Sequence, residues 1–183
     1  MKRLIYIILI ILTASCTIDE VDDNPVYLGN NGITIMAKDW APVGATGIID
    51  GITYTVIDEI ILREMLTNEE DVTRLATTRV TNMSLLFSIQ GPSQPNFNQN
   101  ISNWDVSNVT TMYGMFYVSP FNQPIQYWDV SSVTDMRSMF ERAELFNQNI
   151  SNWNVNNVID CYYFNYDTPS WALPQPNFNN CTL

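Results

Sequence analysis

The most regular feature of the chain is a pattern of apolar and polar positions that occurs three times between Phe97 and Asn157. Each copy begins with Phe-Asn-Gln and contains one tryptophan, at Trp104, Trp128 and Trp153. The copies therefore follow one another after 24 and then 25 residues. A fixed period of this length predicts stacked structural units, each of which buries its apolar side only against its neighbours.

Two apolar spacings alternate within each copy. The first, apolar-x-x-Trp-x-Val, matches the strand pattern of leucine-rich repeats, as in Ile101, Trp104 and Val106. The second has spacings of three and four and predicts a short helix. Its members are Val109, Met112, Met115 and Phe116, then Val133, Met136, Met139 and Phe140. The residues expected to cap these helices are Asn108, Ser132 and Asn157, with Asp135 and Asp160 three residues further on.

Residues 71–87 carry a degenerate copy of the pattern, and 88–96 form a proline-containing loop. The sequence therefore predicts an α/β solenoid resembling a leucine-rich repeat, with about four turns of short parallel strand and short helix. We assign the tryptophans and methionines to its core rather than to a ligand platform. The recurring Asn-Gln pairs at 98–99, 122–123 and 147–148 are expected to hydrogen-bond loop backbone from turn to turn.

The flanking segments are predicted to close the two ends of the stack. A β-hairpin is expected at 26–37 and another around Asp50-Gly51. A helix beginning after Asp58 completes this N-terminal cap. After Phe164 several prolines prevent regular structure, and Trp171, Leu173 and Phe178 are expected to cover the last turn.

The first residues resemble a bacterial lipoprotein signal. Two cations precede a short apolar run, and small residues then lead to Cys16, so we expect lipidation of Cys16. The alternative is an ordinary cleaved signal, because Thr13 stands where a lipobox usually has leucine. The acidic residues that follow Cys16 form either a solvated tether or a surface-export signal.

These signals divide the chain into five segments. They are a signal peptide at 1–15, an acidic tether at 16–25, an N-terminal β/α cap at 26–70, repeats at 71–164 and a C-terminal cap at 165–183.

Charge and composition limit the possible chemistry. The net charge of −11 disfavours binding to nucleic acid, and the chain has no histidine to act as a base or metal ligand. With Cys16 lipidated, Cys161 and Cys181 remain in an oxidising compartment, and we expect a disulfide between them. Two free buried thiols are the alternative.

The long motif F-N-Q-x-I-x-x-W-D-V-S-x-V-T-x-M-x-x-M-F resembles the repeat of the BspA-like leucine-rich repeat bacterial surface lipoproteins. The resemblance covers 71–183, and the preceding 52–66 resembles the leader of the same family. It implies a lipid-anchored outer-membrane protein exposed at the cell surface and, in some members, adhesion. It does not imply an enzyme.

The predicted function is binding by a monomer that uses no cofactor or metal. Outward positions of the predicted strands form a polar strip, with Asp105, Tyr127, Asp129 and Asn154 as the proposed binding face. Asp105 and Asp129 are read as a solvated pair; catalysis or calcium binding by them is the weaker alternative. The expected partner is a host or neighbouring surface macromolecule, protein or glycan. The alternative function is an accessory subunit of an outer-membrane surface complex with no ligand of its own.

Overall fold

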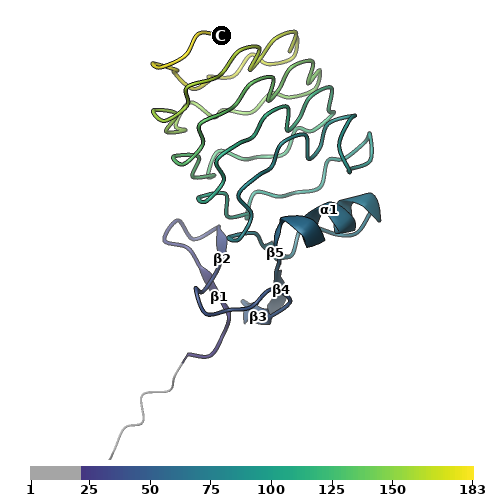
Figure 1. Ribbon diagram of the computed structural model, residues 1–183, viewed down its shortest axis with the longest axis vertical. Helices are drawn as coiled ribbons and strands as arrows, with labels where there is room; N and C mark the ends of the chain where they lie inside the picture. The colour runs from purple at the N-terminus through teal and green to yellow at the C-terminus, as the bar shows by residue number, and fades with distance from the viewer. Residues whose placement is uncertain (1–21) are drawn as a thin grey trace, which may run out of the picture.

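The computed structural model describes residues 22–183. The predicted signal peptide, Cys16 and most of the acidic tether lie outside the described residues. Within them, every regular strand and the helix lie between Val26 and Ala76. The rest of the chain forms a stack of irregular turns on top of these elements, with the C-terminus at the far end of the stack (Figure 1).

Five short strands form two small sheets in the N-terminal part. Strands β1 (Val26–Leu28) and β2 (Ile35–Ala37) pair antiparallel, as the sequence predicted. Strands β3 (Thr46–Ile49) and β4 (Ile52–Val56) form the second predicted hairpin, and β5 (Leu75–Ala76) joins β4 in parallel. The turn between β3 and β4 has positive φ at both Asp50 and Gly51, as a two-residue hairpin turn requires.

Helix α1 (Glu59–Thr67) begins where the sequence predicted. The Asp58 side chain accepts a hydrogen bond from the Ile61 N–H at 3.0 Å, which satisfies a free donor of the first turn. Leu62 and Leu66 are buried in the main hydrophobic core, together with the first turns of the stack. The helix thus packs directly against the repeats (Figure 1).

The predicted α/β solenoid of leucine-rich-repeat type is wrong. No helix or regular strand occurs between 77 and 183, and the segments predicted to be helices are successive tight turns. Alternate backbone N–H groups in these segments bond to the next turn of the stack. The N–H groups of Met112, Gly114, Phe116 and Val118 donate to the carbonyls of Asp135, Arg137, Met139 and Glu141, at 2.8–2.9 Å.

The apolar spacing misled the prediction because three-residue intervals fit tight turns as well as a helix. In a helix, the Phe116 N–H would bond to the Met112 carbonyl, whereas here it bonds to Met139 in the next turn. The backbone changes hand at Gly114 and at the equivalent Ser138, where φ is 55° and 52°. Asn108 and Asn157 consequently cap no helix; their side-chain amides donate to the carbonyls of Thr78 and Ser131, one turn away.

The core assignment from the sequence is confirmed. Trp104, Trp128 and Trp153 are buried, and each indole N–H donates to a backbone carbonyl of the preceding turn at 3.0–3.2 Å. The phenylalanines that open and close each unit stack beside them, as Phe116 does with Phe121 at 4.3 Å between ring centroids. The Asn-Gln pairs bridge successive turns as expected; for example, the Asn122 N–H donates to Asn98 Oδ1.

The C-terminal segment folds back over the last turn. Trp171 is buried against Phe146 at 4.7 Å and its indole N–H bonds to the Gln148 carbonyl. Phe178 packs on Phe164, whereas Leu173, also expected to cover this end, is exposed. The expected disulfide joins Cys161 to Cys181 and ties the segment to the stack.

Candidate functional site

The proposed binding face is only partly exposed. Tyr127, Asp129 and Asn154 lie at the surface, but Asp105 is 2% exposed. The expectation that Asp105 belongs to an open polar strip is therefore wrong. The four residues do not form one continuous accessible surface.

The β1–β2 hairpin is the reason for the burial of Asp105. Ile35 of β2 forms a parallel bridge with Trp104, and the Ile35 N–H donates to the Asn103 carbonyl at 2.8 Å. The hairpin therefore lies along the turn that contains Asp105. A pocket of about 200 Å³ lies between the two, and both Asp105 and Asp129 line it.

A second face, made by the segments predicted to be helices, carries most of the exposed aromatic side chains of the repeats. Tyr113, Arg137 and Tyr162 occupy equivalent positions in three successive turns, each directly after a buried residue. The Arg137 guanidinium carbon lies 5.2 Å from the centre of the Tyr113 ring. Tyr163 and Tyr166 follow Tyr162, and we call these five residues the tyrosine face.

Arg137 is held in place by two carboxylates. It forms ion pairs with Asp135 at 2.8 Å and Asp160 at 3.3 Å. The hydrogen bonds that Arg137 donates to the Asp135 carboxylate raise the pKa of the Arg137 guanidinium above its ordinary value, and the charges of Asp135 and Asp160 act in the same direction. Arg137 thus presents a fixed cation beside the ring of Tyr113.

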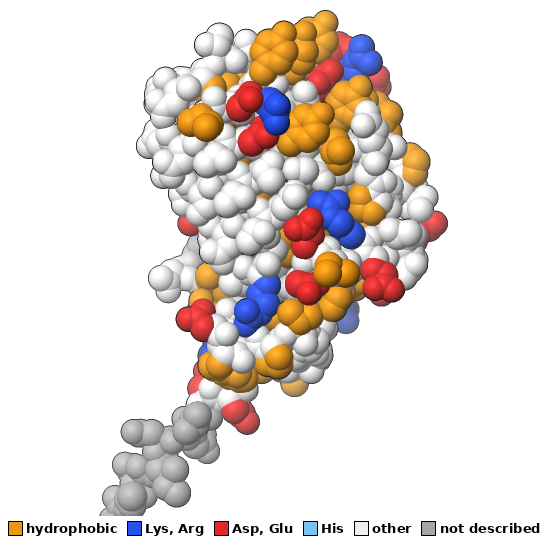
Figure 2. All heavy atoms as spheres, in the orientation of Figure 1, with side chains coloured by type: hydrophobic (Ala, Val, Ile, Leu, Met, Phe, Trp, Pro, Cys, Tyr) orange, Lys and Arg blue, Asp and Glu red, His pale blue; other side chains and the backbone are white. Residues whose placement is uncertain are grey.

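Tyr162, Tyr163 and Tyr166 form a cluster of aromatic rings on this face. The rings of Tyr162 and Tyr163 lie 3.9 Å apart and those of Tyr163 and Tyr166 lie 4.9 Å apart. A hydrogen bond with Tyr162 raises the pKa of the Tyr163 hydroxyl above its ordinary value. Figure 2 shows hydrophobic side chains gathered on the upper turns beside paired charges.

A shallow groove accompanies the tyrosine face. It has a volume of about 180 Å³, and Gly114 and Ser138 line it together with the rings of Tyr113 and Tyr117. Glu141 and Gln90 add polar groups to the same groove. Aromatic rings beside hydrogen-bonding groups suit an uncharged polar ligand or a peptide.

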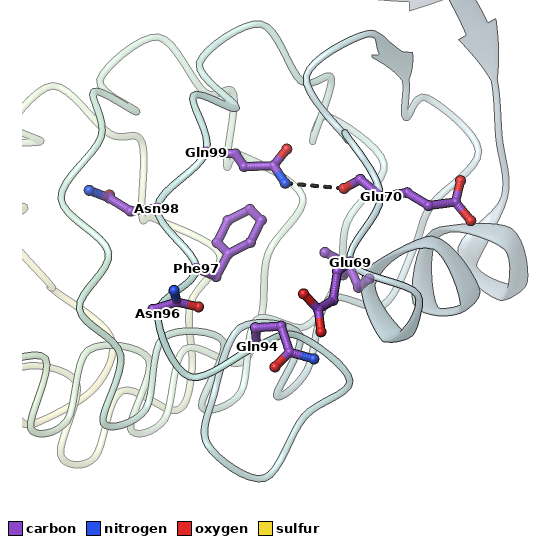
Figure 3. A pocket seen from close by; sticks show the side chains of 8 residues that line it. Glu69, Glu70, Gln94, Asn96, Phe97, Asn98 and Gln99 are labelled. Carbon is purple, nitrogen blue, oxygen red and sulfur yellow. Dashed lines mark hydrogen bonds between the residues drawn. The ribbon is translucent and has the colours of Figure 1, made fainter.

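A larger pocket, of about 360 Å³, lies between the end of α1 and the loop at 88–99 (Figure 3). Glu69 is turned toward Gln94 and Asn96 across it, and the Gln99 amide donates to the Glu70 carbonyl at 3.1 Å. Its lining is acidic and rich in amides. Such a pocket can hold a polar group, but its lining contains no nucleophile paired with a base.

The tyrosine face was not predicted from the sequence, because the segments that carry it were assigned to helices. A usable signal was present: Tyr113, Arg137 and Tyr162 stand at one position of the repeat, next to the buried Met112, Met136 and Cys161. Across residues 22–183, no group of three or more His, Cys, Asp or Glu side chains is arranged to hold a metal ion. None of the helices described there is long and apolar enough to cross a membrane.

Comparison with known proteins agrees with the repeat as the defining feature. The family model described as "Mycoplasma protein of unknown function, DUF285" matches residues 59–175, which include α1 and almost all of the stacked turns. No curated protein and no solved structure matches the chain. Because the family model covers well over half of the sequence, the chain belongs to the DUF285 family.

Proposed function

We propose that this protein is a non-enzymatic surface lipoprotein whose stacked turns bind a protein or glycan partner. The observation that carries the proposal is the tyrosine face, where four exposed tyrosines accompany an arginine held by two carboxylates. Tyrosine and arginine are the residue types enriched at binding hot spots, because they offer large contact areas with few flexible bonds. A rigid stack that displays them suits recognition rather than catalysis.

The anchoring part of the proposal rests on the sequence. The lipobox-like segment before Cys16 and the resemblance to BspA-like lipoproteins support a lipid anchor in the outer membrane, with the stack at the cell surface. The Cys161–Cys181 disulfide is consistent with an oxidising compartment. A Cys16→Ala variant should leave the membrane fraction; a variant that still partitions with membranes would contradict the anchor.

The negative charge of the chain limits the classes of partner that it can bind. A net charge of −11 repels nucleic acid and anionic surfaces, so we expect a neutral glycan or a protein with a neutral or basic contact surface. Binding should weaken little with salt if tyrosine contacts dominate, since screening acts on charges and not on apolar contact area.

The test is a binding screen of the full chain in mild detergent against immobilised glycans and matrix proteins. A Tyr162→Ala, Tyr166→Ala double variant should lower the affinity for any hit at least about tenfold, because hot-spot truncations cost over 1 kcal/mol each. The matched control is Tyr127→Ala with Asn154→Ala, which alters exposed residues of the strip first proposed from the sequence.

The control and the screen also distinguish the tyrosine face from two alternatives: a binding site on the strip around Tyr127, and an accessory subunit with no ligand of its own. Loss of binding in the control alone would move the site to the strip around Tyr127. A chain that binds nothing in the screen but co-purifies with other outer-membrane proteins would instead favour the accessory-subunit function.

A further inference from the structure

The two stacked carboxylate pairs of this protein have different surroundings. Asp135 and Asp160, in neighbouring turns, share Arg137 as a counter-ion. Asp105 and Asp129 are likewise equivalent residues of neighbouring turns, yet neither forms an ion pair among the described residues. Like charges facing each other across adjacent strands or turns are destabilising, so another source of positive charge would stabilise the second pair.

Asp105 is the more unusual member of this pair. Its Oδ1 accepts hydrogen bonds from the Ser107 N–H at 3.0 Å and from the Ser107 hydroxyl at 2.7 Å. Its Oδ2 is buried and has no hydrogen-bond partner. A buried carboxylate oxygen without a donor or cation carries a large desolvation penalty, which structures normally avoid.

Asp129 shares one of these hydrogen bonds one turn further along. Its Oδ1 accepts from the Ser131 N–H at 3.0 Å, which leaves Oδ2 without a hydrogen bond in the described structure. Stacked turns at the usual strand spacing of about 4.8 Å would place the two carboxylates a distance apart that one calcium ion can bridge, with Ca–O bonds of about 2.4 Å each.

The pocket that both residues line supplies further oxygens. Its walls include Asn30, Asn31 and Thr34 of the β1–β2 hairpin and Ser107 of the stack. Carboxylates, amide and backbone carbonyls, and water are the ligands that calcium prefers, whereas zinc would need histidine or cysteine. We propose that Asp105 and Asp129 bind a calcium ion in the pocket between the β1–β2 hairpin and the stacked turns, and that the ion fastens the hairpin to the stack.

The first test is thermal unfolding of the full chain in mild detergent with and without calcium. Saturating calcium should raise Tm by roughly 5–10 °C, the shift expected when a ligand at about 100 times its Kd binds only the folded state. Magnesium at the same concentration should do much less, because it resists dehydration and requires strict octahedral geometry. An equal effect of the two ions, or none from calcium, would overturn the site.

The second test uses terbium as a luminescent stand-in for calcium. Trp104 lines the same pocket, so excitation of tryptophan should sensitise bound terbium, and calcium should compete it away. Asp129→Asn, at an exposed residue, should weaken binding at least tenfold, and Asp105→Asn should abolish it. Because Asp105 is buried, Asp129→Asn decides the outcome if the Asp105 variant does not fold.

Asp160→Asn is the matched control, since that carboxylate already pairs with Arg137. It removes the same charge from the surface without touching the proposed ligands. If it weakens terbium binding as much as Asp129→Asn, the ion is merely attracted to an acidic protein and the proposal fails. This test is independent of the tyrosine face and of any macromolecular partner.

Discussion

At the scale of single residues, the stack depends on backbone conformations that most side chains avoid. Leu85, Gly114, Ser138 and Tyr163 occupy equivalent positions, and all four have φ between 52° and 60°. Only one of them is glycine, although the left-handed region costs other residues about 1–2 kcal/mol. The hydrogen bonds between turns must offset that cost wherever a side chain is present.

Gly114→Ala should lower the free energy of unfolding by about 1–2 kcal/mol. The left-handed φ is unfavourable for alanine, and the added Cβ would lie 2.7 Å from Leu85 Cδ2, so Leu85 would also have to move. Chemical denaturation measures the effect. Ser138→Gly is the control and should be neutral or stabilising; equal stability of the alanine variant and the parent would contradict the assignment.

Trp104→Phe tests the indole bonds between turns. The change keeps an aromatic ring in the core but removes the donor to the buried Val72 carbonyl, 3.0 Å away. We expect a loss of about 2–4 kcal/mol, from the lost hydrogen bond and the smaller side chain. Trp40, which is 57% exposed, provides the comparison: Trp40→Phe should change urea stability very little.

At the scale of elements, the sequence predicted what local chemistry determines. Asp50-Gly51 marked a hairpin, and Asp58 marked the start of α1, because turn and cap residues act within a few positions of themselves. The repeats were predicted wrongly because many of their backbone hydrogen bonds join residues 23 or 24 positions apart. Nothing local distinguishes Met112 and Met115 in a helix from the same residues in stacked turns.

In the candidate site, too, features set by neighbouring residues were predicted from the sequence, and features set by distant contacts were not. The sequence identified exposed residues such as Tyr127 and Asp129, since they alternate with buried tryptophan and valine. It could not anticipate that the β1–β2 hairpin would cover Asp105, because that contact joins residues about 70 positions apart through the Ile35–Trp104 bridge.

Asp58→Ala should weaken α1 and lower stability by about 1 kcal/mol, because the Ile61 N–H loses its acceptor. Asp58→Asn retains an acceptor at the same position and should behave nearly as the parent. Since Leu62 and Leu66 belong to the main core, the loss should appear in the single unfolding transition measured by circular dichroism. A separate early transition of the helix would contradict this packing.

At the scale of the whole molecule, the two ends are closed by different means. The N-terminal part packs α1 and two small sheets against the first turns, whereas the C-terminal part uses aromatic side chains and a disulfide.

Cys181→Ser should lower the free energy of unfolding by about 3 kcal/mol, since the disulfide closes a loop of 20 residues. Intact mass with and without reductant checks the bond itself; two alkylatable thiols in the native protein would rule it out.

The hydrogen bonds between turns have a consequence for how such a molecule can change over generations. Each turn gives its N–H groups to the carbonyls of the next turn in the same alternating pattern. A duplicated segment of 24 residues would find matching donors on one side and matching acceptors on the other, without any change elsewhere. The stack can thus become longer or shorter in whole steps of about 4.8 Å, while the structures that cover its two ends stay the same.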